Sequence, residues 1–472
     1  MPRRHLRLRV EDGADLREGF ARIRQELHVP EDFPADVTAE AEAAAREVRA
    51  PAYDATDIPF LTIDPPGSMD LDQALNIERR GSGFRVRYAI ADVASFVAAG
   101  GAVDQETHRR VETLYSPDIS TPLHPRVLSE AAASLLAGQD RPALLWVIDL
   151  DADGEQTAVE VRRALVRSTD RMDYAGVQAL IDAGTAEERL LLLAEVGKLR
   201  EQREVDRGGV SLPIPEQEVL ETPDGFALAY RVPLACEGWN AQISLLTGMA
   251  AADLMLHGEV GVLRTLPAAP EEEIRRLRRA ASVLDVPWPE GTSYAEVIRG
   301  LDPSNPRHLA LLEEATALLR GAGYTAFDGA VPENATHAAV AAEYAHATAP
   351  LRRLVDRYVG EVCVSLCGGV EVPDWVRKTL PELPKLMAES DRRAGALERE
   401  CVALMEAVVL SPRVGQEFDA AVVDVNEKGG TVQLREPAVR GQCEGTLPLG
   451  ERVRVTLVEA DVTTRRVRFA LA

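Results

Sequence analysis

The spacing of hydrophobic residues changes twice along the chain, and the changes predict three parts. Residues 1–52 begin with a basic, alternating decapeptide and continue with helical periodicity over 15–27 and 35–48. Residues 53–410 show strand patterns at first and mainly helical patterns later. Residues 411–472 are short, Val-rich alternating runs with turn residues between them.

These patterns predict an α+β protein. The helical N-terminal region is compatible with a helix-turn-helix-like unit or with a plain helical cap on the next domain. The middle part is predicted to be one large domain with a mixed sheet surrounded by helices. The last part is predicted to be a small β-barrel of the oligonucleotide-binding type.

Shorter patterns predict individual elements of the middle part. Residues 84–90 alternate between apolar and polar positions, which predicts a half-exposed strand. Residues 143–150 are almost continuously apolar, which predicts a fully buried strand. Helical periodicity predicts one helix over 102–114 and a long charged helix over 382–409.

One acidic stretch stands out among these elements. Residues 60–63 predict a short buried strand that ends at Asp64, and the turn 65–68 (Pro-Pro-Gly-Ser) reverses the chain. Asp70 and Asp72 follow in an alternating segment, so they are predicted to lie on one face of a second strand. The turn would then bring Asp64 back towards them.

Three converging carboxylates repel one another unless a cation lies among them. Oxygen ligands of this kind suit Mg²⁺, or alternatively Mn²⁺, and such a site favours phosphoryl transfer. Acidic residues in a turn are also often merely solvated. Spacing alone therefore leaves a metal site and a solvated turn about equally supported.

Composition limits the other functional classes. The 472 residues are 46% hydrophobic and 27% charged, which is ordinary for a globular protein, but the net charge of −23 is unusual for a protein that binds polyanions. The five cysteines are scattered and odd in number, which predicts no disulfide framework. The N-terminus has no apolar signal core and no apolar run is long enough to span a bilayer. We therefore expect a cytoplasmic protein without membrane partners.

Several motifs in order resemble one known family. TIDPPGSMDLDQAL, YAIADVASFV, TLYSPDISTPLHPRVLSEAAASLL, RMDYAGV and HAAVAAEYAHATAPLRRLVDRY resemble the catalytic RNB domain of the ribonuclease II family. The C-terminal segment resembles an S1 domain. The resemblance covers roughly residues 56–472. Members of the family often begin with cold-shock-type barrels, and the first fifty residues are too few to hold one.

The resemblance implies a function. It implies processive, hydrolytic 3′-to-5′ degradation of single-stranded RNA to nucleoside 5′-monophosphates with one or two Mg²⁺ ions. It also favours the metal-site interpretation of Asp64, Asp70 and Asp72, with Asp72 matching the acid on which the family's activity depends most. We expect a monomer whose partner is single-stranded RNA.

The resemblance also assigns two arginines. Arg352 matches the family arginine that stabilises charge on the scissile phosphate. Pro350 suits the first turn of a helix, so Arg352 and Arg353 are predicted near a helix N-terminus that binds phosphate. Without the resemblance, an ordinary i,i+4 ion pair between Arg352 and Asp356 would be the better interpretation.

Two tyrosines have family counterparts. Tyr115 matches a residue that stacks on RNA bases, and Tyr174 matches a residue close to the scissile nucleotide. Considered singly, each would more often be a buried core tyrosine.

One position departs from the family pattern. Gln73 stands where the motif has a fourth acid, and a neutral amide adds no charge for a second metal ion. This departure favours an alternative function, a catalytically weakened RNA-binding protein of the same family. A metal-dependent phosphatase acting on small molecules is a third hypothesis, but it leaves the S1-like segment without a purpose.

Overall fold

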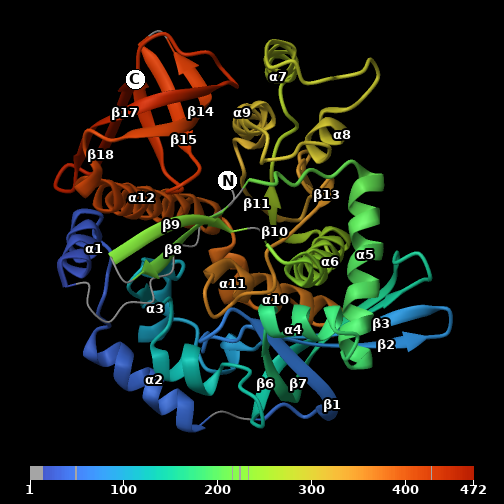
Figure 1. Ribbon diagram of the computed structural model, residues 1–472. Coiled ribbons are helices and arrows are strands. Elements are labelled where there is room, and N and C mark those ends of the chain that lie inside the picture. The colour runs from blue at the N-terminus through green and yellow to red at the C-terminus, as the bar shows by residue number, and fades with distance from the viewer. Residues whose placement is uncertain (1–13, 48–49, 215, 223–224, 232, 427) are drawn as a thin grey trace.

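The computed structural model describes the chain except residues 1–13, 48–49, 215, 223–224, 232 and 427 (Figure 1). The basic decapeptide of the sequence analysis lies outside the described residues. The first two helices are α1 (Ala14–Glu26) and α2 (Ala35–Glu47), each close to its predicted range.

The centre of the large domain is a closed five-stranded barrel. Its strands follow the order β1-β2-β3-β6-β7, in which β1 and β7 pair in parallel and all other neighbours are antiparallel. The predicted mixed sheet is therefore confirmed, in closed form. The strands are β1 (Asp54–Asp64), β2 (Gln73–Arg80), β3 (Gly83–Ala91), β6 (Asp140–Leu150) and β7 (Gln156–Asp173).

Strand β3 differs from the prediction of a half-exposed strand. Only Arg85 and Arg87 within it are partly accessible. Val86 and Tyr88 pack in one hydrophobic cluster, whereas Ala89 and Ala91 pack in another. Both faces of the strand are covered because helices surround the closed barrel (Figure 1).

Ten further helices and four two-stranded sheets surround this barrel in the described part of the chain. The predicted helix over 102–114 is shorter than expected, because α3 ends at Arg110 and Leu114 begins β4. The helices are α3 (Ala102–Arg110), α4 (Tyr174–Asp182), α5 (Glu188–Arg207), α6 (Ala235–His257), α7 (Glu271–Val283), α8 (Tyr294–Arg299), α9 (Pro306–Ala315), α10 (Leu354–Cys367), α11 (Asp374–Thr379) and α12 (Leu383–Leu410). The paired strands are β4 (Leu114–Tyr115) with β5 (Ser120–Thr121), β8 (Glu216–Thr222) with β9 (Gly225–Arg231), β10 (Val260–Thr265) with β11 (Gly323–Asp328), and β12 (Thr336–His337) with β13 (Ala342–Glu343).

The last part of the chain is a second closed barrel, as predicted. Its strand order is β14-β15-β16-β18-β17, with buried Val422, Val432, Val455, Leu457 and Phe469 among the residues that fill its core. Alternation of apolar and polar residues along each strand produces this arrangement, since successive side chains point to opposite faces. The strands are β14 (Glu417–Asn426), β15 (Gly429–Leu434), β16 (Arg440–Glu444), β17 (Arg452–Asp461) and β18 (Arg466–Leu471).

The two N-terminal helices pack into different cores. Phe20 and Ile23 of α1 join a hydrophobic cluster with α12 and the C-terminal barrel. Val37 and Ala41 of α2 join another cluster with the central barrel and α3. A helix-turn-helix unit shares one core between its helices, so this packing favours the helical cap.

Two further expectations concern the chain as a whole. All five cysteines are free thiols, which confirms that they form no disulfide framework. Within the described residues, every helix is too short or too polar to cross a membrane.

Candidate active site

The three predicted metal ligands lie around the β1–β2 connection. Asp64 is the last residue of β1, as predicted. Asp70 and Asp72, however, precede β2, which begins only at Gln73, so the prediction that they share one face of a strand is wrong.

The backbone at Asp70–Asp72 is irregular because its hydrogen bonds go to another segment. The Leu71 N–H donates to Ser134 Oγ at 3.0 Å, and the Leu71 carbonyl accepts from Leu135 N at 3.0 Å. The Asp72 carbonyl accepts from Ala91 N at 2.9 Å. The bonds to Ser134 and Leu135 tie Leu71 to another segment, whereas the bond between Asp72 and Ala91 continues the register of β2 with β3.

Asp72 is buried, with 2% of its surface exposed. Its Oδ1 accepts a hydrogen bond from the Leu351 N–H at 2.7 Å, and its Oδ2 lies 3.4 Å from Arg352 Nε. Burial raises the pKa of Asp72 well above its ordinary value, against the opposing charge of Arg352, and the nearby charge of Asp70 raises it further. A carboxylate in this environment is stabilised by an added cation.

Arg352 lies ahead of the helix on which it was expected. Helix α10 begins at Leu354, and Pro350 is in the preceding turn, where the Arg352 N–H donates to Ala349 O at 3.2 Å. The expectation that Pro350 occupies the first helical turn is therefore wrong. This turn allows Arg352 to reach across to Asp72, with 40% of its side chain exposed.

Arg353 makes the local ion pair that was considered for its neighbour. Its Nε lies 2.5 Å from Asp356 Oδ2 and its Nη2 lies 2.8 Å from Asp356 Oδ1. Asp356 Oδ1 also accepts from Ala349 N at 2.7 Å, so the pair fixes the turn that carries Arg352. A direct contact of Arg353 with RNA stays a prediction.

The two tyrosines of the sequence analysis both lie close enough to Arg352 to interact with its charge. Tyr115, on β4, is 38% exposed, and its phenol contributes to raising the pKa of Arg352. Tyr174 is the first residue of α4, and its hydroxyl accepts a hydrogen bond from Asn240 Nδ2 at 3.2 Å. Burial, followed by the charge of Asp64, raises the pKa of Tyr174 to about 12. Tyr174 is therefore a neutral phenol beside Asp64.

Sequence reasoning missed Tyr88 of β3. Its buried hydroxyl lies 2.9 Å from Ser244 Oγ, and burial raises its pKa, to which Tyr174, Asp64 and Asp72 also contribute. Tyr88 occupies an ordinary inward position of an alternating strand. That pattern alone gave no signal of its place beside the acids.

Gln73 uses its amide to join distant segments. Its Nε2 donates to the Thr348 carbonyl at 2.5 Å, across 275 positions of the chain. A carboxylate could not donate this bond. Gln73, the residue that departs from the family pattern, is therefore hydrogen-bonded to the segment that leads to Arg352.

The donor chemistry of the acids fits Mg²⁺. Magnesium is usually held by one or two carboxylates, with water and substrate phosphate oxygens completing its shell. Asp70 and Asp72 are close enough for the charge of one to raise the pKa of the other. In the described part of the chain, no three acidic, histidine or cysteine side chains converge as ligands of one ion, so the structure does not show the predicted convergence of Asp64, Asp70 and Asp72. The arrangement thus suits an ion that shares its coordination with substrate.

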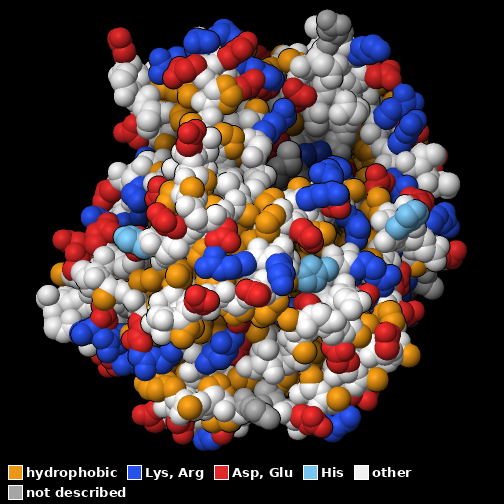
Figure 2. Space-filling model, turned by 180° about the vertical axis from the view of Figure 1, so that it is seen from behind, with side chains coloured by type: hydrophobic (Ala, Val, Ile, Leu, Met, Phe, Trp, Pro, Cys, Tyr) orange, Lys and Arg blue, Asp and Glu red, His pale blue; other side chains and the backbone are white. Residues whose placement is uncertain are grey.

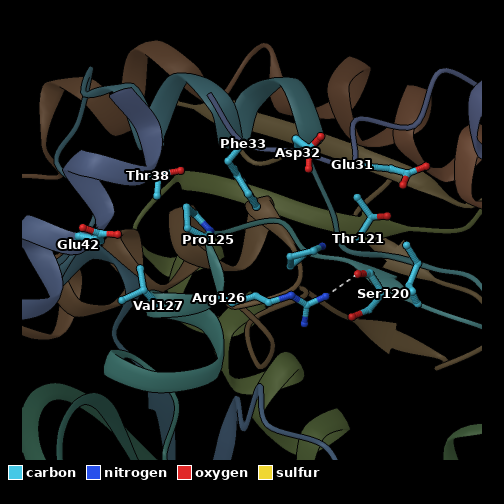
Figure 3. A pocket seen from close by; sticks show the side chains of 12 residues that line it. Glu31, Asp32, Phe33, Thr38, Glu42, Ser120, Thr121, Pro125, Arg126 and Val127 are labelled. Atoms are coloured by element: carbon cyan, nitrogen blue, oxygen red, sulfur yellow. Dashed lines mark hydrogen bonds between the residues drawn. The ribbon is translucent and has the colours of Figure 1, made fainter. Parts of the chain in front are cut away.

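A separate cavity of about 390 Å³ lies beside the β4–β5 hairpin (Figure 3). Among its lining residues are Glu31, Asp32 and Phe33, which follow α1, and Ser120 and Thr121 of β5. Its described lining includes none of the seven predicted site residues. It is therefore distinct from the site around Asp72.

Two family models match the chain. Residues 52–366 match the RNB domain, and residues 416–472 match the RNase II-type exonuclease C-terminal S1 domain. Among relatives, ribonuclease R of Aquifex aeolicus is 25% identical over 95% of this chain and 69% of its own length. Ribonuclease R 1 of Lactococcus lactis is 23% identical over 97% of this chain and 61% of its own. The chain thus spans about two thirds of the length of these relatives.

Solved structures show the same fold. Mycoplasma genitalium RNase R in complex with ribose-methylated single-stranded RNA superimposes with a TM-score of 0.87 at 18% identity, covering 97% of this chain and 78% of that one. Yeast Ssd1, described as a pseudonuclease, superimposes with a TM-score of 0.69 at 15% identity, covering 93% and 54%. One fold therefore occurs in an RNase and in a pseudonuclease.

Proposed function

Because the chain belongs to the RNB family of RNase R-like exoribonucleases, we propose that it degrades single-stranded RNA hydrolytically and processively from the 3′ end, releasing nucleoside 5′-monophosphates with Mg²⁺. The observation that carries this proposal is the buried Asp72 carboxylate 3.4 Å from the guanidinium of Arg352. The RNA bound in the Mycoplasma relative supports the same class of substrate.

Each residue of the site has a proposed task. Asp72, with Asp64 and Asp70, would hold Mg²⁺, which supplies an activated water and charge neutralisation when bound. Arg352 offsets the negative charge that develops on the scissile phosphate, since its guanidinium is permanently charged and partly accessible. Asp72 orients that guanidinium before substrate binds. This preorganisation is what electrostatic catalysis requires.

The tyrosines hold the substrate end. Tyr115 presents an exposed ring beside Arg352, where a base of any identity can stack on it. Tyr174 stays neutral and lies near Asp64, which suits a hydrogen-bonding contact with the terminal nucleotide. Arg353 is kept as a proposed RNA contact next to Arg352, although Asp356 already engages its Nε and Nη2.

The acidic total does not prevent RNA binding. Figure 2 shows acidic and basic side chains interspersed over one face, and a hollow in its upper half with Lys and Arg side chains along the lower rim. A strand that follows such a basic rim avoids most of the negative surface. We propose that RNA reaches the site through a channel of this kind.

A specific pair of observations favours a second candidate, a catalytically weakened RNA-binding protein. Gln73 replaces an acid of the family motif, and a fold neighbour of this chain is a pseudonuclease. Retention of Asp64, Asp70, Asp72 and Arg352 favours the enzyme. The two candidates make opposite predictions for one assay.

That assay uses one RNA sequence in three forms. With Mg²⁺, a 5′-labelled linear RNA should collapse to short end products, while a 3′-labelled copy should release labelled mononucleotide at once. A circular copy should stay intact, because an exonuclease requires an end. EDTA should stop the reaction, and Mn²⁺ should restore it. Intact RNA that only shifts in a native gel would instead establish the binding protein.

Processivity and assembly need separate measurements. An excess of unlabelled RNA added after the reaction starts should leave the bound strands to be degraded to completion. We further propose a cytoplasmic monomer, for which the five free cysteines are suited to a reducing compartment. Light scattering after size-exclusion chromatography should give the mass of one chain.

A further inference from the structure

The hairpin that carries Tyr115 is very small. Strands β4 and β5 contribute two residues each, paired as Leu114 with Thr121 and Tyr115 with Ser120. The turn between them is closed by a hydrogen bond from Ser116 N to Ile119 O at 2.9 Å. A two-stranded ribbon of this length is not stable alone. Its position depends on what holds it from outside.

At its base, the hairpin is joined to the catalytic arginine. The Thr113 N–H donates to the Arg352 carbonyl at 2.9 Å, and the Leu354 N–H donates to the Val111 carbonyl at 2.9 Å. Leu114 is buried in the cluster that contains α1, α12 and the C-terminal barrel. The base of the hairpin is thus fixed beside Arg352.

At its tip, the hairpin is joined to the N-terminal region. Arg24 of α1, 4% exposed, donates from Nη1 to Asp118 Oδ1 at 2.8 Å and from Nε to Glu31 Oε1 at 3.0 Å. The Asp118 side chain is 7% exposed. Burial opposes the charge of Arg24, but its bonds to Asp118 and Glu31 outweigh burial and raise its pKa. A buried, charge-assisted contact of this kind is strongly directional.

On its other side, the hairpin has incomplete packing. Ile119, Ser120 and Thr121 line the cavity of about 390 Å³ (Figure 3). The Thr121 hydroxyl, in a residue that is 4% exposed, has no hydrogen-bond partner among the described residues. On this side β5 is held by a hydrogen bond from Arg126 Nη2 to the Ser120 carbonyl at 2.9 Å, and the ion pair at the tip adds a second constraint.

Helix α1 is itself held firmly. Phe20 and Ile23 are fully buried against α12 and the C-terminal barrel. Arg465 of that barrel pairs with Glu26 of α1 at 2.7 Å and with Glu400 of α12 at 2.8 Å. Arg24 thus projects from a rigid support.

We propose that Arg24 and Asp118 are positioning residues through which the N-terminal helix holds Tyr115 in place to stack on the last bases of the RNA. This inference rests on the proposed function, and it gives the N-terminal region a role in substrate grip. Arg24 does not touch substrate. Its loss should move the aromatic platform rather than remove a catalytic group.

The test compares Arg24→Ala and Asp118→Ala with Arg22→Ala. Arg22 is a matched control because it lies on the same helix and its ion pair with Glu18 is exposed. Both test variants should raise KM for a short single-stranded RNA about fivefold or more, with a smaller change in kcat. Fivefold corresponds to the smallest stacking free energy that the loss of one aromatic side chain usually costs. Arg22→Ala should change neither.

A second readout reports stacking directly. RNA with 2-aminopurine at its 3′ end is bound to protein carrying Asp72→Asn, which stops turnover. Arg24→Ala should reduce the fluorescence quenching of the terminal base, as Tyr115→Ala does. Adding Arg24→Ala to Tyr115→Ala should have little further effect, since residues that act through one another are not additive. Arg24→Lys should restore part of the quenching.

The outcomes are separable. A lower melting temperature with unchanged KM and quenching would overturn the inference and leave Arg24 as a purely structural residue, as would additive effects of Arg24→Ala and Tyr115→Ala. If Arg24→Ala does not fold, Arg24→Lys and Asp118→Asn give the same comparison. Wild-type protein that binds RNA without degrading it would overturn the proposed nuclease, while the quenching measurement still decides the role of Arg24. Wild-type protein that binds no RNA would overturn both.

Discussion

Replacing Asp72 by Asn should reduce the cleavage rate strongly while changing the stability of the fold only slightly. The amide keeps an oxygen that can accept the 2.7 Å hydrogen bond from the Leu351 N–H, so the local backbone is retained. The substitution removes one negative charge beside Arg352 and one oxygen ligand for a cation. The volume of the side chain hardly changes.

The expected effects of Asp72→Asn on the free energy of unfolding nearly cancel. Exchanging a charged acceptor for a neutral one weakens the Leu351 bond by about 1 kcal/mol. Loss of the ion pair with Arg352 adds little to this destabilisation, because 40% of the arginine side chain is exposed and solvent screens the pair. In the opposite direction, the cost of burying a carboxylate disappears. We expect the free energy of unfolding to change by less than about 2 kcal/mol.

The expected effect of Asp72→Asn on the cleavage rate is larger. Removing one preorganised electrostatic group from an active site typically lowers kcat by about 10²–10³. The assay is single-turnover cleavage of 5′-labelled RNA with protein in excess, together with fluorescence anisotropy for RNA affinity and thermal melting. We expect the cleavage rate to fall at least about 100-fold, with affinity within about threefold of wild type.

Asp153→Asn is the matched control. Asp153 lies in the exposed turn between β6 and β7, so the same chemical change there should leave cleavage and melting unchanged. Equal losses of cleavage and RNA affinity in Asp72→Asn would refute the reasoning, because they would make Asp72 a binding or folding residue. Unchanged cleavage would also refute it.

Three further predictions follow from the same contacts. Arg352→Ala should slow single-turnover cleavage by about tenfold or more with little change in melting temperature, whereas a purely structural role would show the reverse. Gln73→Glu should lower the free energy of unfolding by about 1–3 kcal/mol in denaturant titration, since the Thr348 carbonyl loses its donor; unchanged stability would contradict the importance of this bond. His124, whose Nδ1 lies 3.0 Å from the Leu351 carbonyl, has its pKa lowered by burial to about 4. The stabilising contribution of the neutral imidazole is therefore complete above pH 6.5, is lost as pH falls towards 4, and amounts to roughly 3 kcal/mol. Melting curves of His124→Asn should lack this part of the acid dependence, and a wild-type-like dependence would be the contrary result.

The local spacing of apolar residues was sufficient to predict elements whose surroundings stay the same along their whole length. The C-terminal barrel was predicted because its Val-rich strands alternate strictly, with Val455 and Leu457 inward. Helix α12 was predicted almost to the residue, since its heptad-like apolar spacing is long and continuous. The exposure of β3 was predicted wrongly because closure of the barrel buries one face of the strand and surrounding elements cover the other, while its sequence still alternates.

The candidate active site shows where local patterns fail. Asp70 and Asp72 were expected on a strand, but Ser134, which is more than sixty residues away, takes the hydrogen bond of Leu71 and breaks the ladder. Similarly, Pro350 suggested a helix start, but Asp356 holds the turn ahead of α10 through Ala349 N. In the first place a side chain distant from the motif sets the backbone, and in the second Asp356 near the end of the same motif does so; the apolar periodicity records neither contact.

The sequence motif therefore identified the chemical groups, while local and long-range contacts that the apolar pattern does not record set their geometry. Arg352 reaches Asp72 only because its turn is fixed by the Arg353–Asp356 pair. Gln73 contributes by fastening the neighbouring segment at Thr348. Substitutions of Arg353, Asp356 or Gln73 should shift the position of Arg352 without altering its charge. We therefore expect the activity of this chain to depend on these supporting contacts as well as on the acids themselves.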